Sequence, residues 1–282
     1  MTATRPEPAQ AATEPAESGP PAIAAQGDPD RAEPTCGLPP LRHLPWHAPL
    51  RWLAWGWRDF GRCPGIGLFY GACFMAMGWL LRWVFEQAPA YLLALSAGFL
   101  LMGPLLCLGL YQASRRLGRG QTPDLGDSLL AWDQRIGSLA IFGLVLLVLE
   151  LLWARASLVV FALSFDGMPD FKGSLLALLQ ADNLPFIAAY LAVGGLFAGL
   201  IFGVSVVSIP MLLDRPTDAI SAGLTSLRLV LGQPAVMLSW GALITAIVVL
   251  AMLPWFAGLL VAGPVLGHAS WHAYRDAVGA LD

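Results

Sequence analysis

The chain has 282 residues, of which 57% are hydrophobic and only 12% are charged, and its formal net charge is −3. A soluble domain carries roughly 25% charged residues, so a chain this apolar cannot cover its surface with polar side chains and must have lipid as its solvent. No stretch combines basic and aromatic residues as single-stranded nucleic-acid binding requires, so we expect no nucleic-acid partner.

The first 45 residues are rich in Ala, Pro, Glu and Gln and have almost no aromatic side chains. Such a segment cannot bury enough apolar area to offset the entropy lost on ordering. Residues 1–45 are therefore predicted to be a disordered cytoplasmic tail, and residues 46–278 to be one integral membrane domain.

Six apolar stretches are predicted to cross the membrane as helices. Barrel strands would alternate between apolar and polar residues, whereas these runs are continuous and long enough for about 30 Å of hydrocarbon. The last stretch holds two spans, with a turn at Pro254. The spans are residues 65–81, 90–111, 136 to beyond 153, 185–213, and two of about 20 residues each between 235 and 271.

Three short amphipathic stretches are predicted to be helices on the cytoplasmic surface of the membrane. They are residues 48–60, 125–134 and 219–231. In the first of them, Leu50 and Trp57 share a face at helical spacing, and Trp52 is expected at the headgroup boundary.

The order of these elements predicts an internal repeat. A surface helix, a span, an outer turn and a returning span occur three times, and the returning spans carry Pro104, Pro210 and Pro264 near their inner ends. These prolines are expected to kink their helices and free carbonyl groups, which can line a transport site or be purely structural. The predicted fold is an all-α polytopic bundle of about six transmembrane helices with a three-fold repeat of helical hairpins.

The basic residues indicate the orientation. Lys172 and Arg82 flank the predicted outer ends, whereas most arginines flank the inner ends. The positive-inside rule then places both termini in the cytoplasm of a bacterium, with the protein in its inner membrane. The arginines of the inner side are Arg42, Arg51, Arg58, Arg62, Arg115, Arg116, Arg119, Arg135, Arg215, Arg228 and Arg275.

Two histidines near the end of the chain are candidate ligands. His268 and His272 are four residues apart, so they share a face of a helix and could hold a metal or one side of a haem. Further ligands would have to come from elsewhere. The alternative is that both histidines hydrogen-bond lipid headgroups or neighbouring loops, and we expect no cofactor.

Glu150 is the most unusual single residue in the apolar runs. It lies about 20 Å along a span that begins at residue 136, at a rise of 1.5 Å per residue. A charge at this depth is costly and usually faces the bundle interior, where it can relay protons or contact a substrate. Arg155 is five residues further on, which is poorly aligned for a direct ion pair. If the span ends near Trp153, both residues instead lie at the outer interface.

Three segments carry a family resemblance: Arg58-Asp59-Phe60, Gly103-Pro104, and Gly267-His268-Ala269-Ser270-Trp271-His272-Ala273-Tyr274-Arg275. Together they resemble a bacterial family of predicted integral membrane proteins (domain of unknown function 2189), sometimes loosely labelled after cytochrome c oxidase subunit I. The resemblance covers roughly residues 45–278. It implies six helices in the inner membrane and no established activity. A haem–copper oxidase core would need several intramembrane histidines on different helices, and this chain has one pair.

The function predicted from the sequence is a non-enzymatic scaffold or accessory component whose partners are the lipid bilayer and other membrane proteins. No phosphate-binding, hydrolase, zinc-protease or dinucleotide-binding motif occurs in the chain. One alternative is a transporter or permease for a small solute or lipid that uses Glu150. The other is a haem- or metal-binding redox subunit that uses His268 and His272.

Overall fold

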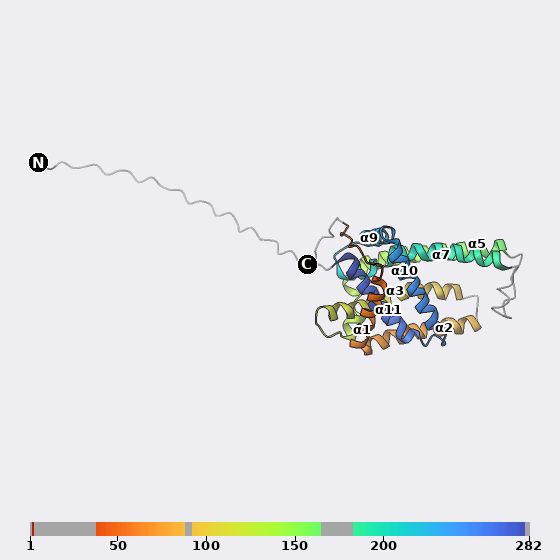
Figure 1. Ribbon diagram of the computed structural model, residues 1–282, viewed down its shortest axis with the longest axis horizontal. Coiled ribbons are helices and arrows are strands. Elements are labelled where there is room, and N and C mark those ends of the chain that lie inside the picture. The colour runs from red at the N-terminus through yellow and green to blue at the C-terminus, as the bar shows by residue number, and fades with distance from the viewer. Residues whose placement is uncertain (1, 3–37, 88–91, 165–182, 280–282) are drawn as a thin grey trace. The chain divides into compact units, whose positions relative to one another are not determined.

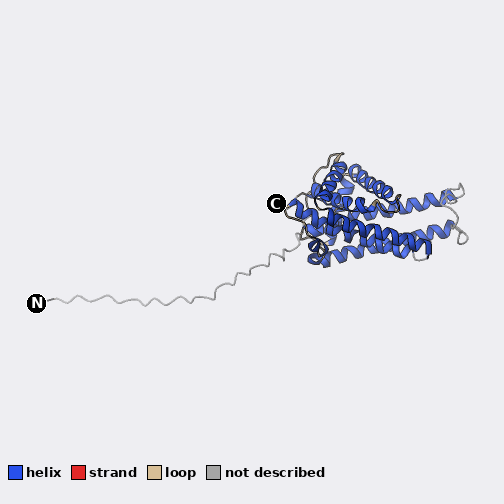
Figure 2. Ribbon diagram, turned by 90° about the horizontal axis from the view of Figure 1, so that it is seen from below, coloured by secondary structure: helices blue, strands red, loops and turns tan. Residues whose placement is uncertain are grey.

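The computed structural model of the protein describes residues 2, 38–87, 92–164 and 183–279 (Figure 1 and Figure 2). The regular elements among these residues are all helices, as predicted. They are α1 (Ala48–Arg62), α2 (Pro64–Gln87), α3 (Leu92–Gly118), α4 (Leu125–Leu129), the short 3-10 helix η2 (Asp133–Arg135), α5 (Ile136–Ser164), α7 (Leu184–Ser205), α8 (Ser208–Asp214), α9 (Ala219–Gly232), α10 (Pro234–Met252) and α11 (Leu259–Val278).

Four helical segments in the described part of the chain are long and apolar enough to cross a membrane. They are Pro64–Gln87, Ile136–Ser164, Leu184–Asp214 and Pro234–Met252. The helices α3 and α11 occupy the places of the other two predicted spans but are not among these four. The predicted turn at Pro254 separates α10 from α11, so the long apolar stretch does form two helices.

Helix α11 lies at the centre of the packing. It contacts α1, α2, α3, α8 and α10, and most residues from Pro264 to its end are buried. In Figure 1 its ribbon runs among those of α1, α2 and α10. The carboxyl-terminal stretch that carries the two histidines is therefore a core element rather than a helix end at the lipid boundary.

Helix α1 is amphipathic as predicted, but its inner face packs on α11. Trp52 is fully buried and meets Trp240 edge to face at 5.5 Å, so its predicted place at the headgroup boundary is wrong. Gly56 lies against Val265 of α11 so closely that a Cβ would be 2.5 Å from that residue's carbonyl oxygen. The outer face keeps Trp57 60% exposed, which leaves it free to contact lipid.

The segment before α1 is attached to the same end of the bundle. The Arg42 N–H donates to the Ala277 carbonyl at 2.9 Å, and the Leu44 N–H donates to the Gln233 side chain at 2.7 Å. These residues fall within the stretch predicted as a tail. The rest of that stretch, residues 1–37, lies outside the described residues except for residue 2.

The three prolines act in two different ways. Pro210 has no N–H to donate to the carbonyl of Val206. The helix is interrupted at residues 206–207, between α7 and α8. Pro104 and Pro264 lie inside continuous helices. Pro264 has no N–H to donate to the carbonyl of Leu260, one turn earlier in α11. This carbonyl is the group nearest to a Cβ built at Gly71 of α2, so α2 and α11 approach each other closely at this point.

Candidate functional site

The two histidines belong to a buried network centred on Asp59. His272 Nε2 lies 2.8 Å from Asp59 Oδ2, and the Ser114 hydroxyl donates to the same oxygen at 2.8 Å. Ser114 Oγ is also 2.7 Å from His268 Nδ1. The network thus joins α1, α3 and α11, and sequence reasoning missed it because its members are far apart in the chain.

The surroundings of Asp59 favour its charged form. Burial alone would raise the pKa of this carboxyl, but the hydrogen bond and charge of His272 and the hydrogen bond from Ser114 outweigh it, so the pKa lies below its ordinary value of 3.8. Because the Ser114 proton is given to Asp59, the proton between Ser114 and His268 must come from His268 Nδ1. Ser114 is therefore not poised as a nucleophile.

A second carboxylate, Asp214 at the end of α8, collects donors from α11 and α3. The Tyr274 hydroxyl donates to Asp214 at 2.8 Å, and Arg275 donates at 3.1 Å. Arg115 forms an ion pair with it at 3.4 Å. Arg215 in turn donates to the Tyr274 oxygen at 2.8 Å, so the phenol both donates and accepts.

A third carboxylate, Asp276 of α11, binds α1. Its Oδ2 accepts from Arg51 at 2.5 Å and from the Trp52 indole at 2.8 Å. The three carboxylates thus hold α1, α3 and α8 to the last turns of α11. Such partly buried, charge-assisted bonds are stronger than neutral ones and fix geometry.

The structure does not surround the histidines with further metal ligands. No group of three or more His, Cys, Asp or Glu side chains within the described ranges is arranged to hold a metal ion. Asp59 and Ser114 occupy one nitrogen of each ring. What the structure brings to His268 and His272 is therefore a carboxylate and a hydroxyl from neighbouring helices.

Glu150 lies on the inward face of α5 and is only 6% exposed. It shares that face with Leu139, Phe142 and Leu146. Its Oε1 atom has no hydrogen-bond partner in the described part of the chain. Arg155, on the same helix, is exposed and forms no ion pair with a described residue, so the structure does not join the two.

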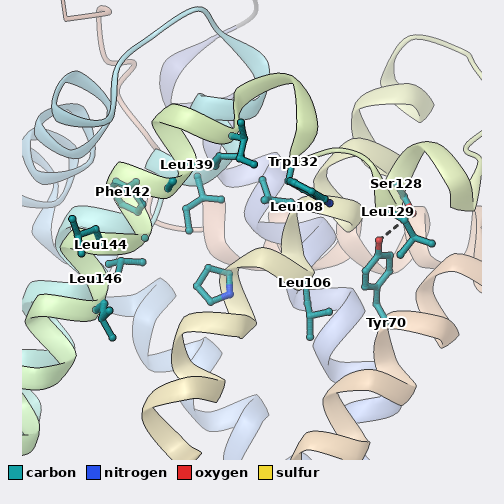
Figure 3. A pocket seen from close by; sticks show the side chains of 16 residues that line it. Tyr70, Leu106, Leu108, Ser128, Leu129, Trp132, Leu139, Phe142, Leu144 and Leu146 are labelled. Atoms are coloured by element: carbon teal, nitrogen blue, oxygen red, sulfur yellow. Dashed lines mark hydrogen bonds between the residues drawn. The ribbon is translucent and has the colours of Figure 1, made fainter.

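An apolar groove of about 620 Å³ lies between α2, α3, α4 and α5 (Figure 3). Figure 3 shows side chains of α3 and α5 facing it, and the Tyr70–Ser128 hydrogen bond at one side. Apart from these two hydroxyls and the Trp132 indole, its lining is apolar. It reaches Leu146 and Leu147 but not Glu150.

No local signal in the sequence marks this groove. Its walls come from apolar runs that look alike, and only their packing leaves the space between them. Ser128 and Trp132 lie in the predicted amphipathic stretch 125–134, which is the nearest that sequence reasoning came to it.

The comparisons with known proteins support the family resemblance. Residues 92–214, from α3 to α8, match the model of a family described as "Predicted integral membrane protein (DUF2189)". No curated protein and no solved structure matches the chain. The matched segment excludes the carboxyl-terminal histidine motif, so the resemblance rests on the middle of the chain. This match and the apolar helices together identify an integral membrane protein.

Proposed function

We propose that this integral membrane protein is a non-enzymatic scaffold or accessory component of the bacterial inner membrane. The observation that carries the proposal is how its chemically capable side chains are used. Asp59, Asp214 and Asp276, with both histidines, bind one another and their neighbours across helices. Side chains whose hydrogen bonds hold helices together are not available to bind a substrate.

The proposed architecture has six spans, arranged as three units of a short helix and a hairpin. The third unit is α9, α10 and α11, and the first is α1, α2 and α3. With 27 residues in α3 and 20 in α11, each helix reaches about 30 Å or more at 1.5 Å per residue. Both are therefore long enough to cross the bilayer beside the four apolar segments.

The proposed orientation has both termini in the cytoplasm. The inner-side arginines Arg51, Arg115, Arg215 and Arg275 all bind groups near the end of α11. Arg82 lies instead near the carboxyl end of α2, over the Trp255 ring. The excess of arginine at one end supports the positive-inside assignment.

The experiment that tests the proposal is a visible absorption spectrum with metal analysis on protein purified in mild detergent. We expect a colourless protein without stoichiometric metal. We also expect His272→Ala to lower the melting temperature as Asp59→Ala does, because each removes the bond between His272 and Asp59. A Soret band, or bound metal that is lost in His268→Ala and His272→Ala, would replace this proposal with a redox role.

A transporter that uses Glu150 is the second candidate, because a buried carboxylate without a described partner is a typical relay group in membranes. Its test is proton uptake into proteoliposomes under an imposed potential, followed with an internal pH dye. If the protein transports protons through Glu150, the flux should disappear in Glu150→Gln. It should persist in Glu86→Gln, because Glu86 is an exposed residue in the last turn of α2. Equal leakage with and without wild-type protein would end this reading.

A further inference from the structure

The length of the groove matches the thickness of one leaflet of a bilayer. Its α5 wall runs from Ile136 to Leu147, which is about 16 Å at 1.5 Å per residue and matches half of a hydrocarbon core of about 30 Å. Its volume of about 620 Å³ falls within the roughly 300–1,000 Å³ of typical ligand pockets. Rim side chains such as Leu144 and Ile136 are more than half exposed, so the groove opens to the surroundings of the bundle.

One end of the groove is closed by α4. Asp127 of α4 forms an ion pair with Arg116 of α3, and Ser128 is bonded to Tyr70 of α2. Because the Ser128 hydroxyl donates to the Leu125 carbonyl, the Tyr70 hydroxyl is the donor to Ser128. Both hydroxyls are therefore occupied and offer little to a polar ligand inside the groove.

An apolar groove of this kind excludes a peptide as its occupant. A peptide segment would bring backbone N–H and C=O groups that the lining cannot satisfy, and each costs several kcal/mol in an apolar medium. A helix would satisfy its own backbone groups, and crosslinking to a second copy of the chain tests for that occupant. An acyl chain has no hydrogen-bonding groups and matches the lining.

Positive charge lies beside the closed end. Arg135 directly precedes Ile136 of the groove, and Arg119 lies just past the end of α3. Each of them lies within electrostatic range of Arg115, in the last turn of α3. Neither Arg119 nor Arg135 has a carboxylate partner within the described residues. Two unneutralised arginines at this level complement an anionic headgroup.

We infer that the groove between α3, α4 and α5 binds one acyl chain of an anionic phospholipid, with its phosphate at Arg119 and Arg135. The site follows from the groove and its charges and does not depend on the scaffold proposal. Only the leaflet rests on the proposed orientation, which makes it the cytoplasmic one.

The test uses full-length protein in phosphatidylcholine vesicles that contain a small fraction of phosphatidylglycerol with a diazirine on one acyl chain. After irradiation, adducts are mapped by peptide mass spectrometry. We expect adducts concentrated on the α3 and α5 walls of the groove rather than on exposed α5 positions outside it, such as Leu151 and Leu158. Unlabelled phosphatidylglycerol should compete, whereas inorganic phosphate should not.

Matched variants separate the two parts of the site. Ala140→Trp fills the groove and should remove most adducts, whereas Ala162→Trp, exposed on the same helix outside the groove, should not. Arg119→Glu with Arg135→Glu should weaken phosphatidylglycerol labelling by about five-fold or more per arginine, but not labelling by a phosphatidylcholine probe. Arg228→Glu, exposed on α9, is the charge control.

Three results would overturn the inference. They are adducts spread evenly over exposed α5 positions, competition by inorganic phosphate alone, and crosslinks from the groove to a second copy of the chain. The competition arm needs no variant, so it decides the question even if Ala140→Trp does not fold. A Soret band or bound metal would remove the scaffold proposal but would leave these results unchanged.

Discussion

Asp59 illustrates how long-range contacts decide the environment of a single residue. It lies beside the exposed Arg58 on an amphipathic helix, yet it is 4% exposed and accepts from Ser114 and His272. A buried carboxylate is tolerated only when its oxygens are hydrogen-bonded, and these donors satisfy that requirement. His272 therefore has a structural partner without any ligand.

Replacing Asp59 tests that reading. We expect Asp59→Asn to destabilise the protein by about 1–3 kcal/mol, because the charged acceptor shared by two donors is lost. Thermal unfolding in detergent measures the effect. Asp133→Asn, at an exposed position without a described ion-pair partner, is the control and should change the melting temperature little. Equal melting temperatures for the two variants would contradict the network.

The same carboxyl predicts a dependence on pH. Its pKa is lower in the folded protein than its ordinary value of 3.8, so the folded state binds fewer protons. The stabilisation is complete above the ordinary pKa and is lost as the pH falls through the folded pKa. The gap in melting temperature between wild type and Asp59→Asn should therefore shrink from about pH 6 to about pH 3. A gap that widens on acidification would contradict a lowered pKa for Asp59.

At the scale of elements, close helix contacts depend on particular glycines. Gly56 meets Val265 and Ala269 of α11, and Gly71 meets Leu260 of the same helix. Gly61, five residues after Gly56 on α1, has no atom of another residue near its missing Cβ. Composition alone cannot distinguish these glycines, because each is an ordinary glycine in a helical stretch.

Two substitutions in α1 test the contact. Gly56→Ala should cost about 1–3 kcal/mol through overpacking against the α11 backbone. Gly61→Ala should be neutral or stabilise by about 0.5–1 kcal/mol, because alanine loses less entropy in a helix. Their melting temperatures in detergent, compared with wild type, measure the difference. A stabilising Gly56→Ala would show that α1 does not pack on α11.

At the scale of the whole molecule, the two ends of the bundle differ in charge chemistry. At one end, arginines bind the carboxylates around the end of α11. At the other, Arg82 pairs with Glu86 at 2.7 Å, and the Trp79 indole donates to the Trp255 carbonyl at 2.7 Å. Aromatic and isolated basic residues of this kind are typical of a membrane interface.

Cysteine labelling tests the proposed orientation. In a chain whose native cysteines are replaced by alanine, Glu86→Cys and Arg58→Cys place single thiols at the two ends. A membrane-impermeant maleimide should label Glu86→Cys in intact spheroplasts and Arg58→Cys only after lysis, because the proposed orientation places the arginine-rich end in the cytoplasm. The opposite pattern would invert the protein, and labelling of both before lysis would contradict a spanning bundle.

The sequence by itself determined the helices, the turn at Pro254 and the separation of basic residues to one end. These follow from hydropathy and turn chemistry, which act over neighbouring residues. The observed helices differ in length from the predicted spans mainly where a helix continues past its apolar stretch, as α3 does to Gly118. The amphipathic stretch 125–134 became a short helix and a 3-10 turn, because α4 ends at Leu129.

Only the tertiary structure decided what the polar residues contact. Asp59 and His272 are 213 positions apart, and the groove is enclosed by helices from four parts of the chain. Trp52 is buried for the same reason, since the face that α1 turns inward depends on α11. In an apolar chain many helices can pack on many others at similar cost, and it is the few charged groups and close glycine contacts, all long-range, that select one arrangement.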